Sequence, residues 1–142
     1  MKRTYRWQFH FNAVHNMVPE NPENGHTHSF LVRLWLEITD MDMELQNFCE
    51  KELKRYLAQY NGRYLNEMDK FSGKIPTIEN ICEVLYYDMG KIVADYGMEL
   101  IQMEIGDSPV ALFMMGKKLL LGETGLIISD ELFEKYKQQL NQ

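Results

Sequence analysis

The chain has 142 residues, of which 45% are hydrophobic and 25% are charged, and its formal net charge is -6. This size and composition predict a single domain, residues 1–142, with enough apolar surface for a core. No block of Lys and Arg stands out, so we expect no nucleic-acid partner. No apolar run approaches the ~20 residues that span a bilayer, and the first residues lack the apolar stretch of a signal peptide. We therefore expect no membrane partner.

The two cysteines, Cys49 and Cys82, lie in segments that read as separate helices. A disulfide framework is therefore not expected, and a reducing cytoplasm is the natural compartment. On helix faces, both thiols are interpreted as core residues rather than catalytic ones.

The first half of the chain begins with two predicted strands. Residues 4–15 alternate between apolar and polar side chains, which is typical of a strand with one buried face. Residues 16–25 contain two prolines and a glycine and predict a loop, and residues 26–39 alternate again. An antiparallel pair joined by this ten-residue loop is the simplest arrangement.

Two helices are expected next. Over residues 44–60 the apolar positions Leu45, Phe48, Leu53 and Leu57 follow a helical spacing. A second helix is expected after Pro76, with Thr77 as its N-cap, Glu79 in its first turn and Gly97 at its end.

The rest of the chain predicts strands near 98–105 and 109–115, split by the turn GDSP. A short hairpin is expected in LLLGETGLII, and Ser129 suits the cap of a closing helix of about ten residues. The order β-β-α-α-β-β defines an α+β fold with a four-stranded antiparallel sheet and two helices. The hairpin and closing helix form a C-terminal extension over about 116–142, beyond a core of about 4–115.

All four histidines fall at positions 10, 15, 26 and 28. His26 and His28 are two residues apart at the start of a strand, so both side chains leave the same face. His15 ends the first strand, and the loop can return the chain so that the three imidazoles converge. Three imidazoles with one open position are typical of a catalytic Zn²⁺. The alternative is that these are ordinary strand and loop histidines. His10 has the opposite parity to His15 and is left out of the site.

The motifs FNAVH and GHTHSF resemble the FxAAH and HGH(N/S)(Y/F) signature of the 6-pyruvoyl- and 6-carboxy-tetrahydropterin synthases. YLN at 64–66, PTIEN at 76–80 and the acidic Glu104 follow in the same order. The resemblance implies the tunnelling fold (T-fold), a homohexamer built as a dimer of trimers, and zinc held by His15, His26 and His28. It also implies that Glu104 anchors a pterin ring, with Thr77 and Glu79 of PTIEN as further substrate-binding candidates.

The sequence departs from this family where protons are moved. The family's usual Cys in the loop before the HxH pair is absent, and Glu20 and Glu23 are the ionisable residues of that loop. Glu23 lies three residues before His26, where a subgroup of the family places a Glu and forms a hydroxymethyl-dihydropterin. A carboxylate with a raised pKa can act as a general base, although both glutamates read equally well as solvated loop residues. The family's Asp-His pair before the YLN-like segment is missing too, and Asn61 cannot titrate.

Two functions therefore remain in view. The first is a zinc-dependent pterin lyase or synthase acting on 7,8-dihydroneopterin triphosphate or a close relative, within queuosine- or folate-type biosynthesis. Its catalytic candidates are Glu23 and, second, Glu20. The alternative is a zinc- and pterin-binding module of the same fold without lyase chemistry, which the missing Cys, Asp and His favour.

Overall fold

The computed structural model describes residues 2–40, 42–108, 111–116 and 138. The predicted C-terminal hairpin and closing helix lie outside the described residues, apart from residue 138. Four strands form one antiparallel sheet in the order β1-β2-β3-β4. Their bounds are Arg3–His15 for β1, His26–Ile38 for β2, Met98–Ser108 for β3 and Ala111–Gly116 for β4. The α+β prediction is confirmed.

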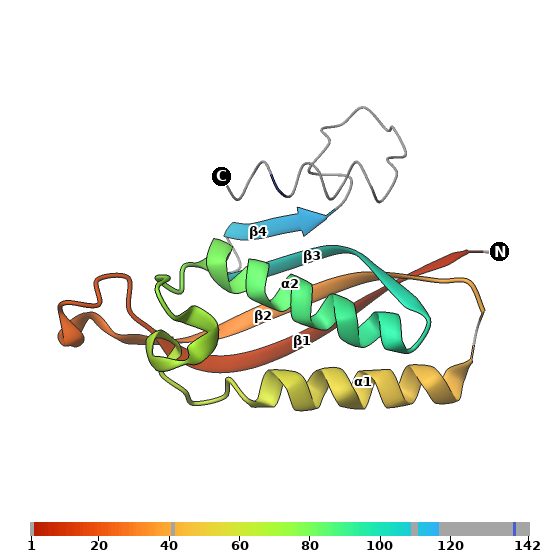
Figure 1. The fold of residues 1–142 in the computed structure, drawn as a ribbon, viewed down its shortest axis with the longest axis horizontal. Helices are drawn as coiled ribbons and strands as arrows, with labels where there is room; N and C mark the ends of the chain where they lie inside the picture. Colours follow the sequence, from red (N-terminus) through yellow and green to blue (C-terminus); the bar gives the residue numbers. More distant parts are fainter. Residues whose placement is uncertain (1, 41, 109–110, 117–137, 139–142) are drawn as a thin grey trace.

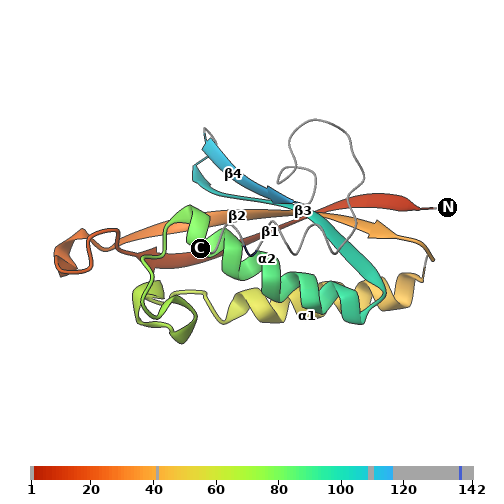
Figure 2. The ribbon, with the colours of Figure 1, turned by 45° about the horizontal axis from the view of Figure 1, so that its top comes forward.

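Two helices lie between β2 and β3 in sequence and pack on the same side of the sheet (Figures 1 and 2). Helix α1 spans Met43–Ala58, and the Asp42 carboxylate caps it by accepting from two backbone N–H groups of its first turn. Helix α2 spans Ile78–Asp95 and is capped by Thr77 as predicted. Among the described residues, no helix is long and apolar enough to cross a membrane.

The core lies between the helices and one face of the sheet. Alternate residues of β2 are fully or almost fully buried there, as the period of two requires: Phe30, Val32, Leu34, Leu36 and Ile38. On α1 the buried residues are Cys49, Leu53 and Leu57, and Cys82 is buried on α2. The interpretation of both thiols as core residues is therefore confirmed.

The predicted apolar face of α1 was wrong at its first two positions. Leu45 and Phe48 are 44% and 49% exposed. The buried row repeats every four residues from Cys49. Leu45 is one repeat earlier on the same row but lies in the first turn of the helix, and Phe48 lies to one side of the row. Helical spacing alone does not show where along a helix the buried part of its apolar face begins.

The segment after α1 runs beside the outer edge of β1, close to its end. Gly62 N–H donates to Asn12 O at 2.7 Å, and Val14 N–H donates to Arg63 O at 2.9 Å. The Asn61 side chain joins them, because its Oδ1 accepts from Asn12 N–H at 3.0 Å. These bonds satisfy the edge of β1 where it approaches His15. Between Thr4 and His10, no further strand pairs with that edge within the described residues.

A polar network ties the two helices together. The Tyr56 hydroxyl donates to Asp88 Oδ2 at 2.6 Å and lies 2.7 Å from the Tyr60 hydroxyl, while Lys70 Nζ donates to the same Asp88 oxygen at 2.8 Å. Burial, followed by these hydrogen bonds, raises the pKa of Tyr56 far above its ordinary value. Tyr56 therefore stays protonated and donates to Asp88 over the whole pH range in which the protein is handled.

Replacing Tyr56 by Phe removes the donor and leaves both of its oxygen partners without it. We expect Tyr56→Phe to lower the free energy of unfolding by about 1–3 kcal/mol, measured by urea denaturation. Tyr96→Phe is the matched control, since the Tyr96 hydroxyl makes no hydrogen bond to any residue that the structure describes. Equal losses in the two variants would show that the network does not stabilise the protein.

Candidate metal centre

Three histidines meet at the end of the sheet where the β1–β2 loop begins. His15 is directly opposite His26 in the β1–β2 pairing, and Ala13 is directly opposite His28. Because residues two apart share a face, all three imidazoles leave the sheet on the side of the helices. In Figure 1 this end of the sheet continues into the loop that projects beyond both helices.

The three rings are in contact with one another. Their centroids are 4.4 Å apart for His15 and His26, 5.1 Å for His15 and His28, and 4.4 Å for His26 and His28. One nitrogen from each ring lies within 4.8 Å of the other two. The predicted convergence of these side chains is therefore present in the fold.

Backbone carbonyls orient two of the rings. His15 Nδ1 lies 2.9 Å from Pro76 O, and His26 Nδ1 lies 3.1 Å from Asn24 O. A carbonyl oxygen can only accept, so each neutral ring donates from Nδ1 and carries its lone pair on Nε2. His15 Nε2 is buried and has no hydrogen-bond partner among the described residues.

The surroundings of His15 favour the form that binds a metal. Burial lowers the pKa of His15 most, the Pro76 carbonyl opposes this, and repulsion by His26 and His28 lowers it further. A neutral imidazole whose buried lone pair accepts no hydrogen bond from any described residue is suited to binding a metal ion. The three residues fit a borderline transition ion such as Zn²⁺, for which neutral imidazole is a common ligand.

Two asparagines fix the backbone next to His15. The Asn66 side chain accepts from Asn16 N–H and donates to Asn16 O, both at 2.8 Å, so it pairs with that residue as a strand would. The buried Asn16 side chain then bonds to Val18 N–H and Asn21 O within the loop. Asn66 belongs to the YLN motif, and this geometry gives the motif a structural role beside the histidines.

The PTIEN motif contributes through its backbone. The carbonyl that orients His15 belongs to Pro76, and the Thr77 hydroxyl accepts from Asn80 N–H at the start of α2. Glu79 is exposed in the first turn of that helix. The sequence did not reveal the role of Pro76, because a carbonyl that acts 61 residues away leaves no side-chain signal.

The two loop glutamates are both exposed. Glu23 lies in a short 3-10 turn, Pro22–Asn24, and the next residue of that turn supplies the carbonyl that contacts His26. Glu20 precedes the turn. Neither carboxylate is among the groups whose ligand atoms converge with the histidines in the described part of the chain.

Glu104 lies on the other face of the sheet. It is paired with Arg33, whose parity in β2 is opposite to that of His28. Arg33 Nη1 approaches Glu104 Oε2 at 3.4 Å, and Arg33 Nε donates to Gln8 Oε1 at 3.1 Å. Glu104 and the three histidines of one subunit therefore face opposite sides of the same sheet.

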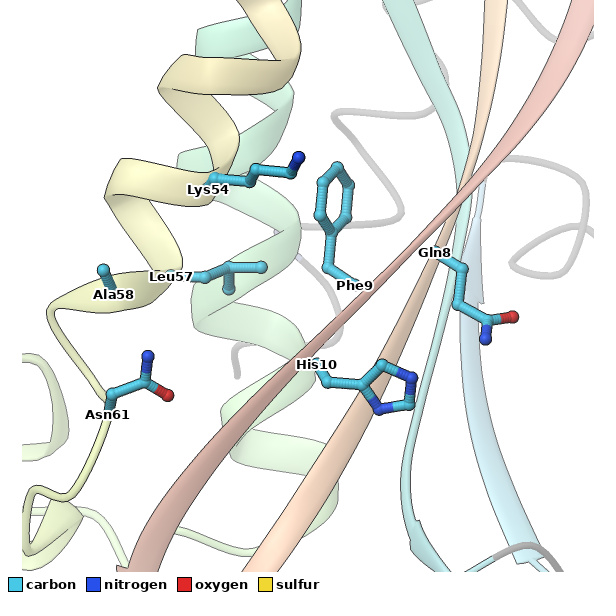
Figure 3. Close-up of a pocket in the computed structure, with 7 residues that line it drawn as sticks. All are labelled: Gln8, Phe9, His10, Lys54, Leu57, Ala58 and Asn61. Carbon is cyan, nitrogen blue, oxygen red and sulfur yellow. The ribbon is translucent and has the colours of Figure 1, made fainter.

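His10 is separate from the cluster, as its parity predicted. It lines a hollow of about 390 Å³ between β1 and α1, in which Phe9 points toward the helix while Gln8 and His10 point away from it (Figure 3). The other lining residues are Lys54, Leu57, Ala58 and Asn61. The hollow contains none of the three convergent histidines, so it is not the candidate metal centre.

A four-stranded antiparallel sheet with two helices on one face, inserted between its second and third strands, is the architecture of a T-fold protein. The model of the 6-pyruvoyl tetrahydropterin synthase family matches residues 4–117, and the chain belongs to that family. No curated protein matches it significantly.

Solved structures show the same fold. The 6-pyruvoyl tetrahydropterin synthase of Caenorhabditis elegans has a TM-score of 0.67 at 19% identity, with 82% of this chain and 96% of that chain covered. An uncharacterised protein from Wolinella succinogenes has a TM-score of 0.60 at 14% identity, covering 82% and 98%. The Plasmodium vivax synthase, in a catalytic-residue variant, has a TM-score of 0.60 at 10% identity, covering 81% and 97%. At these identities the likeness concerns the fold.

The histidine cluster predicts that the purified protein carries about one transition-metal ion per subunit. We expect His28→Ala to lose most of it, because removing one of three protein ligands weakens binding by orders of magnitude. Elemental analysis after dialysis against a weak chelator measures the content. His10→Ala is the control and should keep the metal. A His28→Ala protein with the wild-type content would refute the three-histidine site.

Proposed function

We propose that this protein is a zinc-dependent pterin lyase or synthase that acts on 7,8-dihydroneopterin triphosphate or a close relative. Family membership supports the pterin chemistry. The observation that carries the metal site is the buried Nε2 of His15, which has no hydrogen-bond partner among the described residues. His15, His26 and His28 would hold the ion. When bound, zinc would supply Lewis-acid polarisation of a substrate oxygen.

Glu23 is the proposed general base, with Glu20 as the second candidate. Glu23 is next to Asn24, whose carbonyl contacts His26, so its backbone lies close to one of the proposed ligands. A relative supports a glutamate in this role, because the Plasmodium vivax structure is of a variant in which a catalytic glutamate is replaced by alanine. If Glu23 plays that part here, a hydroxymethyl-dihydropterin is the expected product.

Glu104 is proposed as the anchor for the pterin ring, acting together with the histidines of a neighbouring subunit. A carboxylate can accept two hydrogen bonds from the amino and ring N–H groups of a pterin. Along β2, however, Arg33, the partner of Glu104, lies five positions from His28, or about 17 Å, and the side chains of Glu104 and His28 face opposite sides of the sheet. One pterin is too short to span that path within a single subunit. Thr77 and Glu79, at the start of α2, remain further candidates for substrate contacts.

A pterin site shared between subunits requires the protein to form an oligomer. In the part of the chain that the structure describes, β1 and β4 are the two edge strands of the sheet, and no further strand pairs with β1 between Thr4 and His10. We expect these edges to pair between subunits, and family membership favours a homohexamer. The buried free thiols Cys49 and Cys82 suit a reducing, cytoplasmic location.

The alternative is a zinc- and pterin-binding module without lyase activity. One observation favours it specifically. Asn61, which lies where the family carries an Asp-His pair, uses its side-chain oxygen to pair with the β1 backbone. At this position the side-chain amide therefore has a structural role, and an amide cannot transfer a proton as an Asp or His can.

The glutamate assignment predicts the effect of removing one titratable group. Glu23→Gln keeps the size of the side chain but cannot take a proton, so turnover should fall by about 10²–10⁴-fold. Zinc content and pterin affinity should stay near wild type. Turnover is measured by mass-spectrometric detection of the product from 7,8-dihydroneopterin triphosphate. Glu20→Gln is the matched control, with the same loop, charge and exposure.

Three outcomes would change this assignment. Full activity in both variants would show that neither loop carboxylate takes part in the reaction. Loss of activity in Glu20→Gln alone would transfer the role to that residue. Saturable pterin binding by the wild-type protein without any product would favour the binding module.

The assembly proposal predicts a mass of about six subunits in solution. Multi-angle light scattering at micromolar concentration measures it, and the value should not change on moderate dilution. A monomer would contradict both the shared pterin pocket and the pairing of strand edges.

A further inference from the structure

A carboxylate that the sequence did not single out lies beside the metal centre. Asp107 is near the end of β3, and its Oδ2 is 3.6 Å from His28 Nε2. The two side chains are 21% and 32% exposed, so both remain in contact with solvent. The charge of Asp107 also reaches His15, whose pKa it raises slightly against the larger effect of burial. Asp107 is therefore on the side of the sheet that carries the histidines.

Asp107 flanks the cluster without completing it. The group of ligand atoms that lie within 4.8 Å of one another contains His15, His26 and His28 among the described residues, and Asp107 is outside that group. A fourth ligand would have to approach all three nitrogens, as the tetrahedral geometry of zinc requires. The carboxylate instead adds one negative charge next to His28.

We propose that Asp107 determines ligand specificity at the metal centre by disfavouring anionic molecules and leaving the ion to neutral ones. This inference rests on the proposed metal-binding function. A carboxylate or phosphate that approached the ion would come within a few ångströms of Asp107, and like charges at that separation repel appreciably even near the surface. A neutral hydroxyl group meets no such repulsion and can donate a hydrogen bond to the carboxylate.

Such a charge would also orient a substrate that has both kinds of group. In a molecule that carries phosphates at one end and hydroxyl groups elsewhere, both could compete for the ion. Repulsion by Asp107 favours the hydroxyl-bearing part at the metal and turns the phosphates away. Asp107 would therefore act as a specificity-determining residue that keeps the charged end of such a substrate away from the ion.

The test uses protein loaded with Co²⁺, whose visible spectrum changes when a ligand binds the ion. Azide is the anionic probe and imidazole the neutral probe, titrated at constant ionic strength. Asp107→Asn removes the charge at nearly constant size, so its azide affinity should rise by about tenfold or more while its imidazole affinity changes less than about threefold. Cobalt content should equal that of the wild type.

Glu99→Gln is the matched control, because it removes the same charge from the same strand, eight positions from Asp107 and on the face opposite to the buried Met98 and Leu100. Its azide affinity should equal that of the wild type. Asp107→Ser serves as a second variant if Asp107→Asn does not fold, with the same expected change.

Four results would overturn the inference. Unchanged azide affinity in Asp107→Asn would show that the Asp107 charge does not affect the ion, and an equal gain in Glu99→Gln would show a general effect of net charge. Loss of cobalt from Asp107→Asn would make the carboxylate a ligand. A wild-type protein that takes up no cobalt would refute the proposed function as well, whereas the first three results leave that function standing.

Discussion

The pairing of β1 with β2 is the constraint on which the candidate site depends. Phe11 and Phe30 are directly opposite each other and stack with ring centroids 5.0 Å apart. The next pair on that face is Ala13 with His28, and the last is His15 with His26. A slip of one residue would send His26 and His28 to the other face and bury polar side chains in place of the aromatic pair. The core packing that stabilises the sheet therefore also brings the imidazoles together.

Burial is distributed unequally within the cluster, and the inequality has chemical consequences. His15 is 2% exposed and its ring is held by a backbone carbonyl, whereas His26 is exposed and His28 is half-buried. The buried ligand is already neutral and oriented, so binding an ion there requires little reorganisation. A molecule that reaches an ion held by this cluster would approach on the side of the two accessible rings. Asp107 contacts one of these rings, so its charge acts on that approach.

The strands, the helices and the convergence of the three histidines could be predicted from the sequence, because these features depend on local periodicity. The alternation in both strands gave the correct faces for His15, His26 and His28, and Thr77 marked the start of α2. What the sequence did not reveal acts over long separations through polar backbone contacts. Pro76 orients His15 from 61 residues away, and Asn66 pairs with Asn16 from 50 residues away. Neither contact imposes a pattern on neighbouring residues.

The acidic residues of β3 show the limit of counting along a strand. Glu104 and Asp107 are three residues apart, and in a regular strand an odd separation places two side chains on opposite faces. Which of the two faces the histidines depends on the pairing with β2, and that pairing shifts at Trp35 and Leu36. The sequence alone did not locate this irregularity, so it did not show that Asp107 lies beside the candidate metal centre.

The groups that position the ion and those expected to move protons differ in how strongly the fold constrains them. His15 and Asn16 are buried, and Asn16 bonds to Asn66. Changing any of these residues would disturb packing or leave polar atoms unsatisfied, with a cost to stability. Glu20 and Glu23 are exposed, and surface substitutions of that kind usually change stability by less than about 0.5 kcal/mol. A substitution of a loop carboxylate therefore costs little stability, whereas one beside the histidines costs more, so the fold constrains the candidate metal ligands more strongly than the loop carboxylates.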